Sequence, residues 1–168
     1  MIKRIFWPDI YCKSVKAIDF KKIYRNGFKG LIFDIDNTIV GYDNFDIKKE
    51  IFDLFIELEE IGFKICLVSN SFKKRVAYFE NVLNIKSFNT ALKPLPFGIM
   101  KGIKYLGVPK DKIVMIGDQI FTDVICARLN NIFVVLVEPI KERVEFFNRF
   151  KRKLELKILN KYNKEKKK

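Results

Sequence analysis

The residues that could do chemistry begin with two carboxylates in the stretch LIFDIDNTIV, residues 31–40. Its apolar start predicts a buried strand, and side chains two apart on a strand share one face. Asp34 and Asp36 should therefore point the same way. Two such charges about 4 Å apart repel by roughly 4 kcal/mol at an effective dielectric constant near 20. The pair predicts a bound cation, or proton chemistry, at this place.

Two further carboxylates, Asp118 and Asp123, lie in the stretch IGDQIFTD. If the fold brings all four acids together, a cation is needed to offset their repulsion. The chain contains no histidine, which excludes His-ligated zinc and the Ser–His and Cys–His triads. Because oxygen ligands without histidine or cysteine favour Mg²⁺, the acids predict a magnesium site.

A calcium-binding loop is the other interpretation of the stretch DIDNTIVGYDNF. The EF-hand loop requires glycine at its sixth position and glutamate at its twelfth. Counted from Asp34, these positions hold Ile39 and Phe45. The calcium interpretation is therefore excluded.

Groups that could bind a phosphoryl group follow the other apolar runs. Ser69 and Asn70 come after one run, and backbone N–H groups beyond them should open a helix near residue 72, where anions bind. Lys93 adds a positive charge before Pro94. Together with a cation, these groups would surround the oxygens of a phosphoryl group. One of the paired acids could then act as a nucleophile and the other as a proton donor and acceptor.

Each of these signals is weak when taken alone. Two aspartates at the end of a strand often belong to an ordinary loop, and a lone serine or lysine on a loop is usually solvated. Asp123 could merely cap a helix that starts near Thr122. The specific signal is the ordered set, because every group follows the end of a predicted strand.

The elements that must position these groups alternate along the chain. Strands are predicted at 30–36, 64–69, 87–91, 112–117 and 132–137, of which the third is weak. Helical spacing of apolar residues covers 47–61, 72–83, 97–106 and 122–130, and Gly62 should end the first of these helices.

This alternation predicts an α/β fold, a Rossmann-like three-layer α/β/α sandwich around a central parallel sheet of about five strands. In such sheets, ligands bind beyond the carboxyl ends of the strands. All the polar residues named above fall at that edge.

The four motifs together resemble those of the haloacid dehalogenase (HAD) superfamily. DIDNT is similar to its first motif, DxDxT, which implies that Asp34 is the nucleophile and Asp36 the general acid/base. CLVSN resembles the second motif and implies that Ser69 contacts phosphate; we extend this prediction to Asn70. ALKP resembles the third motif and implies that Lys93 does so too.

The fourth HAD motif, GDxxxxD, is similar to GDQIFTD. The resemblance implies a Mg²⁺ site formed by the Asp34 carboxylate, the Asp36 backbone carbonyl and Asp118, with Asp123 in support. HAD enzymes choose substrates largely through inserted cap domains. The intervals from Asp36 to Ser69 and from Ser69 to Lys93 are too short for a cap, so we expect none and an open site.

Most of the chain resembles one branch of HAD subclass IIIA, the YqeG-like and phosphatidylglycerophosphate phosphatase family. The resemblance rests on WPDIYCKSVKAIDF, NGFKGLIFDIDNT, LKPLPFGI and IGDQIFTDV. It implies removal of the terminal phosphate of phosphatidylglycerophosphate. An anionic phospholipid at a membrane surface would then be the partner, and a homo-oligomer could close the open site.

The charge of the chain is unevenly distributed. Of the net +13, residues 1–30 carry +6, residues 141–168 carry +8 and the middle carries −1. We therefore expect a single domain over 1–168, with a catalytic core at 31–140, a basic N-terminal extension at 1–30 and a basic C-terminal helix and tail at 141–168. Basic ends suit an anionic partner or a solvated surface.

The expected location is the cytoplasm, peripheral on the inner face of the membrane. No apolar run approaches the roughly 20 residues of a membrane span, and the N-terminal stretch lacks the features of a targeting signal. Cys12, Cys66 and Cys126 form no CxxC pair, which suits a reducing compartment.

The C-terminal segment has two interpretations. Within 141–158, apolar residues recur at helical spacing among basic ones: Val144, Phe147, Phe150 (or Lys151), Leu154 and Ile158. This pattern predicts either an interfacial helix on anionic lipid, with Trp7 as a further anchor, or an ordinary helix packed on the sheet with Trp7 in the core.

Two other functions stay open. One is a soluble phosphomonoesterase acting on a sugar, a nucleotide or a nucleic-acid end. The other is a protein that binds RNA or a ribosome through its basic ends. The DxD pair argues against the second, because a pure binding module has no need of two adjacent acids, so no stable nucleic-acid partner is expected.

Overall fold

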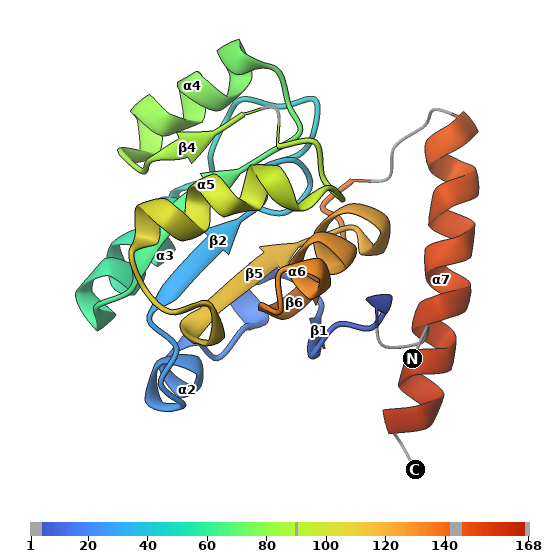
Figure 1. Cartoon of the computed structure of the whole chain (residues 1–168). Helices are drawn as coiled ribbons and strands as arrows, with labels where there is room; N and C mark the ends of the chain where they lie inside the picture. The colour runs from blue at the N-terminus through green and yellow to red at the C-terminus, as the bar shows by residue number, and fades with distance from the viewer. Residues whose placement is uncertain (1–4, 90, 142–145, 167–168) are drawn as a thin grey trace.

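A computed structural model of the chain describes residues 5–89, 91–141 and 146–166. Its centre is a sheet of six parallel strands in the order β1-β6-β5-β2-β3-β4 (Figure 1). The strands are β1 (Ile10–Cys12), β2 (Gly30–Phe33), β3 (Lys64–Val68), β4 (Ser87–Phe88), β5 (Ile113–Gly117) and β6 (Phe133–Val137). The predicted parallel sheet is confirmed, with one strand more than the five expected.

Helices cover both faces of this sheet. They are α2 (Phe20–Arg25), α3 (Lys49–Ile61), α4 (Lys73–Leu83), α5 (Pro96–Leu106), α6 (Ile125–Leu129) and α7 (Phe146–Lys166), with short turns η1 (Val15–Ala17), η2 (Lys110–Lys112) and the π-helical η3 (Ile120–Val124). Gly62 ends α3 at a φ of 103°, as predicted, because glycine has no Cβ to oppose this left-handed conformation.

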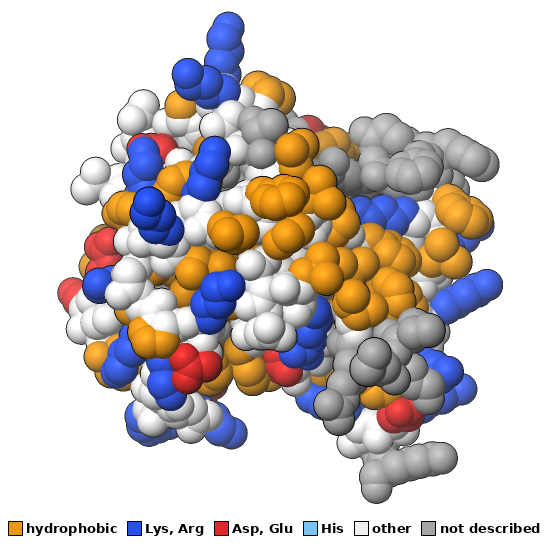
Figure 2. Space-filling model, in the orientation of Figure 1, with side chains coloured by type: hydrophobic (Ala, Val, Ile, Leu, Met, Phe, Trp, Pro, Cys, Tyr) orange, Lys and Arg blue, Asp and Glu red, His pale blue; other side chains and the backbone are white. Residues whose placement is uncertain are grey.

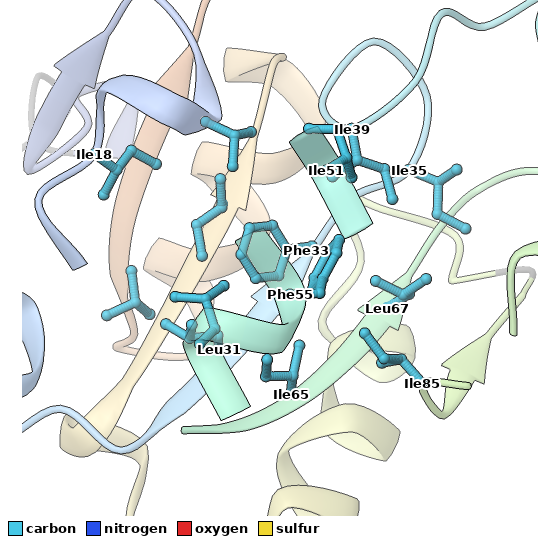
Figure 3. Close-up of a cluster of buried hydrophobic side chains, with 14 of the residues drawn as sticks. Ile18, Leu31, Phe33, Ile35, Ile39, Ile51, Phe55, Ile65, Leu67 and Ile85 are labelled. Atoms are coloured by element: carbon cyan, nitrogen blue, oxygen red, sulfur yellow. The ribbon is translucent and has the colours of Figure 1, made fainter. Parts of the chain in front are cut away.

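Alternate side chains of the central strand face opposite layers. Leu31 and Phe33 of β2 pack with Phe55 of α3 in one hydrophobic cluster, where α2, α3 and α4 lie (Figure 3). Ile32 points to the other cluster, which contains side chains of α5, α6 and α7. This alternation follows from the two-residue period of a strand and confirms the three-layer sandwich.

The N-terminal segment is part of the sheet, which the division at residue 30 did not anticipate. β1 pairs in parallel with β6, with Ile10 beside Val135, and forms the edge of the sheet. Phe20 and Ile23 of α2 are buried in the first cluster. These residues therefore belong to the packed core and are not an appended basic extension.

Helix α7 packs on the molecule with one face. Leu159 and Tyr162 are buried, and Ile158 packs against the second cluster. Phe150 and Leu154 are exposed. Of the predicted apolar stripe, Ile158 packs on the core, as in an ordinary helix, whereas Phe150 and Leu154 stay exposed, as an interfacial helix would require. Val144 and the side chain of Phe147 lie outside the described residues.

Trp7 contributes to the attachment of α7. Its ring makes an edge-to-face contact with Tyr162, with ring centroids 5.8 Å apart. This position is neither a free membrane anchor nor the centre of the core. Of the helices in the described ranges, none combines the length and apolar character needed to cross a membrane.

The connections that would carry a cap domain are short. Between β2 and β3 the only described helix is α3, and between β3 and α5 the described elements are α4 and β4. The expected absence of an inserted cap is confirmed for these connections. In the described part of the chain, no inserted domain covers the carboxyl edge of the sheet.

Candidate active site

The predicted site residues gather at the carboxyl edge of the sheet. Asp34 directly follows β2, Ser69 follows β3 and Asp118 follows β5, while Lys93 lies between β4 and α5. Backbone hydrogen bonds extend the sheet to this edge, because the Asp34 N–H donates to Ile116 O at 2.9 Å. All the predicted site residues except Asn70 are buried.

Strand β2 is shorter than predicted. It ends at Phe33, so neither Asp34 nor Asp36 lies on the strand, and their side chains do not share a strand face. The chain turns sharply here: Asn37 has a φ of 63°, and Asp36 forms an isolated bridge with Val40. This turn separates the two carboxylates and gives each a cation of its own.

Lys93 forms a buried ion pair with Asp34. Its Nζ donates to Asp34 Oδ1 at 2.5 Å, to Asp123 Oδ1 at 2.7 Å and to Val68 O at 3.1 Å. Burial alone would lower the pKa of Lys93, but the attraction of Asp123 and Asp34 outweighs it and raises the pKa above its ordinary value. Lys93 is therefore a permanently charged group at the centre of the site.

Burial dominates the ionisation of Asp34. Loss of water raises the pKa of this carboxyl to about 7; Lys93 lowers it and Asp123 raises it. Burial, with Asp123 and Asp34 nearby, raises the pKa of Asp118 as well. Such shifts are typical of acids that work in pairs or bind cations.

Asp34, Asp118 and Asp123 form a cluster that could hold a cation. One carboxylate oxygen of each lies within 4.8 Å of the others. Among the described residues, Asp118 Oδ1 is buried and finds no hydrogen-bond partner. A buried unpartnered oxygen is costly, and a cation would satisfy it. Since every donor is a hard oxygen, the residues fit Mg²⁺.

Asp123 lies within the acid cluster, and its predicted supporting role stays a prediction. It belongs to the trio, and its Oδ2 also accepts the Gln119 N–H at 3.1 Å. Asp123 lies inside η3, so it does not cap a helix that starts near Thr122; it holds the backbone N–H of Gln119 instead. The predicted contribution of Asp36 to the metal is its backbone carbonyl, which stays a prediction.

Asp36 is held apart from this cluster by Ser71 and Arg75. Arg75 Nε donates to Asp36 Oδ1 at 2.8 Å, and the Ser71 hydroxyl donates to Oδ2. The guanidinium of Arg75 is buried, donates to Gly41 O at 3.0 Å and lies about 5 Å from the ring centroid of Phe79. The repulsion between Asp34 and Asp36 is thus offset by two separate cations.

Ser71 and Arg75 are site residues that the sequence analysis did not single out. Arg75 could have been found from its position, four residues before Phe79 on the apolar stripe of the predicted helix 72–83. A basic residue on a buried stripe needs an acidic partner. Ser71 offered no comparable signal.

The groups predicted to bind phosphate already make hydrogen bonds within the protein. Ser69 Oγ accepts the Ser71 N–H at 3.1 Å. The Asn70 amide donates to Lys93 O at 3.0 Å and accepts from Lys93 N at 2.8 Å. Asn70 therefore holds the backbone of Lys93, and its contact with phosphate stays a prediction.

Comparison with known proteins identifies the family of the chain. Residues 1–141 match the family described as mitochondrial PGP phosphatase. A relative from Bacillus subtilis (strain 168), "Probable phosphatase YqeG", is 33% identical over 160 residues, which are 95% of this chain and 93% of that protein. The Arabidopsis thaliana protein "Phosphatidylglycerophosphate phosphatase 1, chloroplastic/mitochondrial" is 28% identical over 92% of this chain, which spans 47% of that longer protein.

Solved structures share the fold. An uncharacterized protein from Listeria monocytogenes serotype 4b superposes with a TM-score of 0.56 at 16% identity, over 70% of this chain and 85% of that one. A Bacteroides fragilis protein assigned to the haloacid dehalogenase-like hydrolases gives 0.55 at 15% identity, over 71% and 92%. With this fold and these relatives, the chain belongs to the mitochondrial PGP phosphatase family, is a phosphatase and shares the fold of a haloacid dehalogenase-like hydrolase.

Proposed function

We propose that this phosphatase is Mg²⁺-dependent, works through an aspartyl-phosphate on Asp34 and acts on phosphatidylglycerophosphate. The observation that carries the chemistry is the buried trio of Asp34, Asp118 and Asp123 beside Lys93, with one unpartnered oxygen on Asp118. A structural cluster would leave no such oxygen, whereas a site built for a cation requires it.

The residues divide the reaction between them. An Asp34 oxygen bonds to phosphorus as the bond to the leaving oxygen breaks, and Asp36 gives that oxygen a proton. Water then attacks the phosphorus, Asp36 takes its proton, and the bond to Asp34 breaks to release phosphate. Lys93 and Ser69 hold the phosphoryl oxygens during both steps. Bound Mg²⁺ would neutralise the acids and draw charge from the phosphoryl group.

The substrate proposal rests on the relatives and on the surroundings of the site. The matched family is described as a PGP phosphatase, and the Arabidopsis thaliana relative is named a phosphatidylglycerophosphate phosphatase. Exposed apolar side chains occupy the same segments as the site residues: Phe72 lies three residues after Ser69, and Leu92, Leu95 and Phe97 lie within four residues of Lys93 in the sequence. Figure 2 shows hydrophobic side chains gathered on this face of the molecule over α5 and toward α7. Such a surface suits a substrate that stays in a lipid layer.

An anionic membrane surface is the partner that we propose. The net charge of +13 attracts anionic lipid, and each basic side chain near a membrane surface adds about 1 kcal/mol. The protein would then act peripherally, at the cytoplasmic face of the membrane. We propose no stable nucleic-acid partner, and assembly into a homo-oligomer remains a prediction.

The test measures phosphate release from phosphatidylglycerophosphate in mixed micelles, with Mg²⁺ and with EDTA, beside a panel of soluble phosphomonoesters. We expect Mg²⁺-dependent release that favours the lipid and is lost in Asp34→Asn. Activity on soluble esters alone would keep the chemistry and overturn the lipid substrate. Activity that persists in EDTA or in Asp34→Asn would overturn the mechanism.

A further inference from the structure

Helix α7 reaches the loop that carries two of the site acids. Glu155 of α7 is buried, and its Oε1 accepts the N–H of Ile120 at 2.9 Å and that of Phe121 at 3.3 Å. One turn earlier, Lys151 donates to the side chain of Gln119. These contacts join residues more than thirty positions apart in the chain. The loop from Asp118 to Asp123 is therefore held from outside its own segment.

The loop needs this support because its own residues leave backbone donors unpaired. The η3 helix begins at Ile120, and Gln119 before it makes no side-chain cap. The first N–H groups of a helix have no partner within the helix and attract negative charge. Glu155 provides that charge to Ile120 and Phe121, while Asp123 accepts the Gln119 N–H. Three consecutive N–H groups are thus held by two carboxylates.

A continuous set of hydrogen bonds links Glu155 to the reaction centre. It runs from Glu155 through the η3 backbone to Asp123, then to Lys93, and from Lys93 to Asp34. The loop also packs against β5 without spare room, because a Cβ on Gly117 would lie 2.4 Å from Asp123 Cγ. Movement of the loop backbone would therefore displace Asp123 directly.

Packing alone does not explain a glutamate at this position. An apolar residue would fill a buried place on α7 at lower cost, since a buried carboxylate must be compensated by hydrogen bonds. Within the described residues, Glu155 forms an ion pair with Arg152 at the long distance of 3.4 Å, and the charge of Lys151 also acts on it. Its close partners are the two backbone N–H groups of the loop.

We propose that Glu155 is a positioning residue that holds the Asp118–Asp123 loop in the geometry required by the cation site. Glu155 lies beyond residues 1–141, the part of the chain that matches the family. The inference rests on the proposed function, because it takes the acid trio to be the place where Mg²⁺ binds.

The other end of α7 is anchored independently, which makes the inference testable. Leu159 and Tyr162 are buried, and the Tyr162 ring contacts Trp7. Lys166 Nζ donates to Asp9 O at 2.7 Å. Substitution of Glu155 should therefore leave α7 docked and release only the loop.

The experiment measures Mg²⁺ binding to the full chain by calorimetry, without substrate, together with hydrogen exchange of the Ile120 and Phe121 amides. Glu155→Ala should weaken Mg²⁺ binding about tenfold, which is roughly 1.4 kcal/mol, and should speed exchange at both amides. Glu155→Gln keeps one acceptor oxygen and should show a smaller change in the same direction. High Mg²⁺ should restore the turnover of a small soluble ester by Glu155→Ala.

Two control variants separate positioning from general stability. Glu165→Gln makes the same chemical change on an exposed part of α7 and should alter neither measurement. Leu159→Ala removes buried packing from α7 one turn beyond Glu155 and leaves the Glu155 carboxylate in the chain. The two variants are compared under conditions in which they have the same free energy of unfolding. If Leu159→Ala then weakened Mg²⁺ binding as much as Glu155→Ala, the positioning role would be overturned.

The remaining outcomes are also decisive. Wild-type affinity for Mg²⁺ in Glu155→Ala, or unchanged amide exchange, would overturn the inference while leaving the proposed function intact. Failure of the wild-type protein to bind Mg²⁺ would overturn the metal-dependent mechanism, and this inference with it.

Discussion

At the scale of single residues, the site separates two neighbouring acids by giving each its own buried cation. Asp34 is paired with Lys93, and Asp36 with Arg75. The first pair borders the acid trio, while the second is backed by the ring of Phe79. The separation keeps a proposed nucleophile and a proposed proton carrier in different electrostatic surroundings, as their different tasks require.

Removal of Arg75 should destabilise the fold strongly. Arg75→Met leaves the buried Asp36 carboxylate without its cation, and breaking a buried ion pair in this way costs about 3–5 kcal/mol. Urea unfolding of Arg75→Met, Asp36→Asn and the double variant measures the coupling between the two side chains. The double variant should be more stable than Arg75→Met; a loss equal to the sum of the two single losses would show that the pair is not coupled.

The pH dependence of stability should depend on Asp34. Because its folded-state pKa of about 7 lies above the usual value near 4, the folded state binds the proton more tightly than the unfolded state. This group therefore makes the free energy of unfolding fall as the pH rises from about 4 to 7.

Asp34→Asn removes this dependence. In EDTA, the variant should gain stability relative to the wild type between pH 5 and pH 8, by a few kcal/mol at most. Urea unfolding at the two pH values measures the gain. A constant difference between the two proteins would contradict the raised pKa.

At the scale of elements, the central strands and their helices were predictable, the edge strand β4 only weakly and the edge strand β1 not at all. Continuous apolar runs such as IVMIG and FVVLV mark strands buried on both faces. β1 has only three half-buried residues and depends on β6 for its pairing, so its own sequence gives little signal.

The orientation of α7 could not be predicted from its apolar stripe. Phe150 is exposed and Glu155 is buried, opposite to what their side-chain polarity indicates. Burial of Glu155 depends on two N–H groups of a distant loop. Likewise, the pairing of Asp36 with Arg75 and that of Asn70 with Lys93 are tertiary contacts between residues far apart in the sequence. Residue type and spacing predict which groups gather at the site, but not which pairs form within it.

The observed orientation of α7 predicts unequal effects along the helix. Leu159→Ala should lower the free energy of unfolding by about 2–5 kcal/mol, because it opens a cavity in the second cluster. Phe150→Ala removes an exposed side chain and should change it by less than about 0.5 kcal/mol. Chemical denaturation of both variants checks the orientation, and similar losses would contradict it.

At the scale of the whole molecule, the open carboxyl edge and the exposed apolar residues lie together on a strongly basic chain. We expect the double variant Leu95→Ser and Phe97→Ser to lower binding to vesicles of anionic phospholipid several-fold, because apolar area and charge both contribute to interfacial binding. Co-sedimentation measures this binding.

The matched control is Ile56→Ser, which removes an exposed apolar side chain from α3, in the layer on the other face of the sheet. It should bind vesicles like the wild type, and turnover of a soluble ester should persist in all three proteins. Equal losses in the control and the double variant would show that the apolar residues near Lys93 are not the docking surface.

The edge formed by β1 has a consequence for biosynthesis. β1 pairs with β6, so Ile10 cannot pair in the sheet until Val135 has been synthesised. Likewise, Trp7 cannot contact its aromatic partner until Tyr162 has been synthesised. Chains emerge from the ribosome with the N-terminal part first. A nascent chain stalled before β6 should therefore expose residues 7–12 to proteases. Residues 7–12 should become protected only after β6 and α7 have left the exit tunnel, because these two elements supply their contacts.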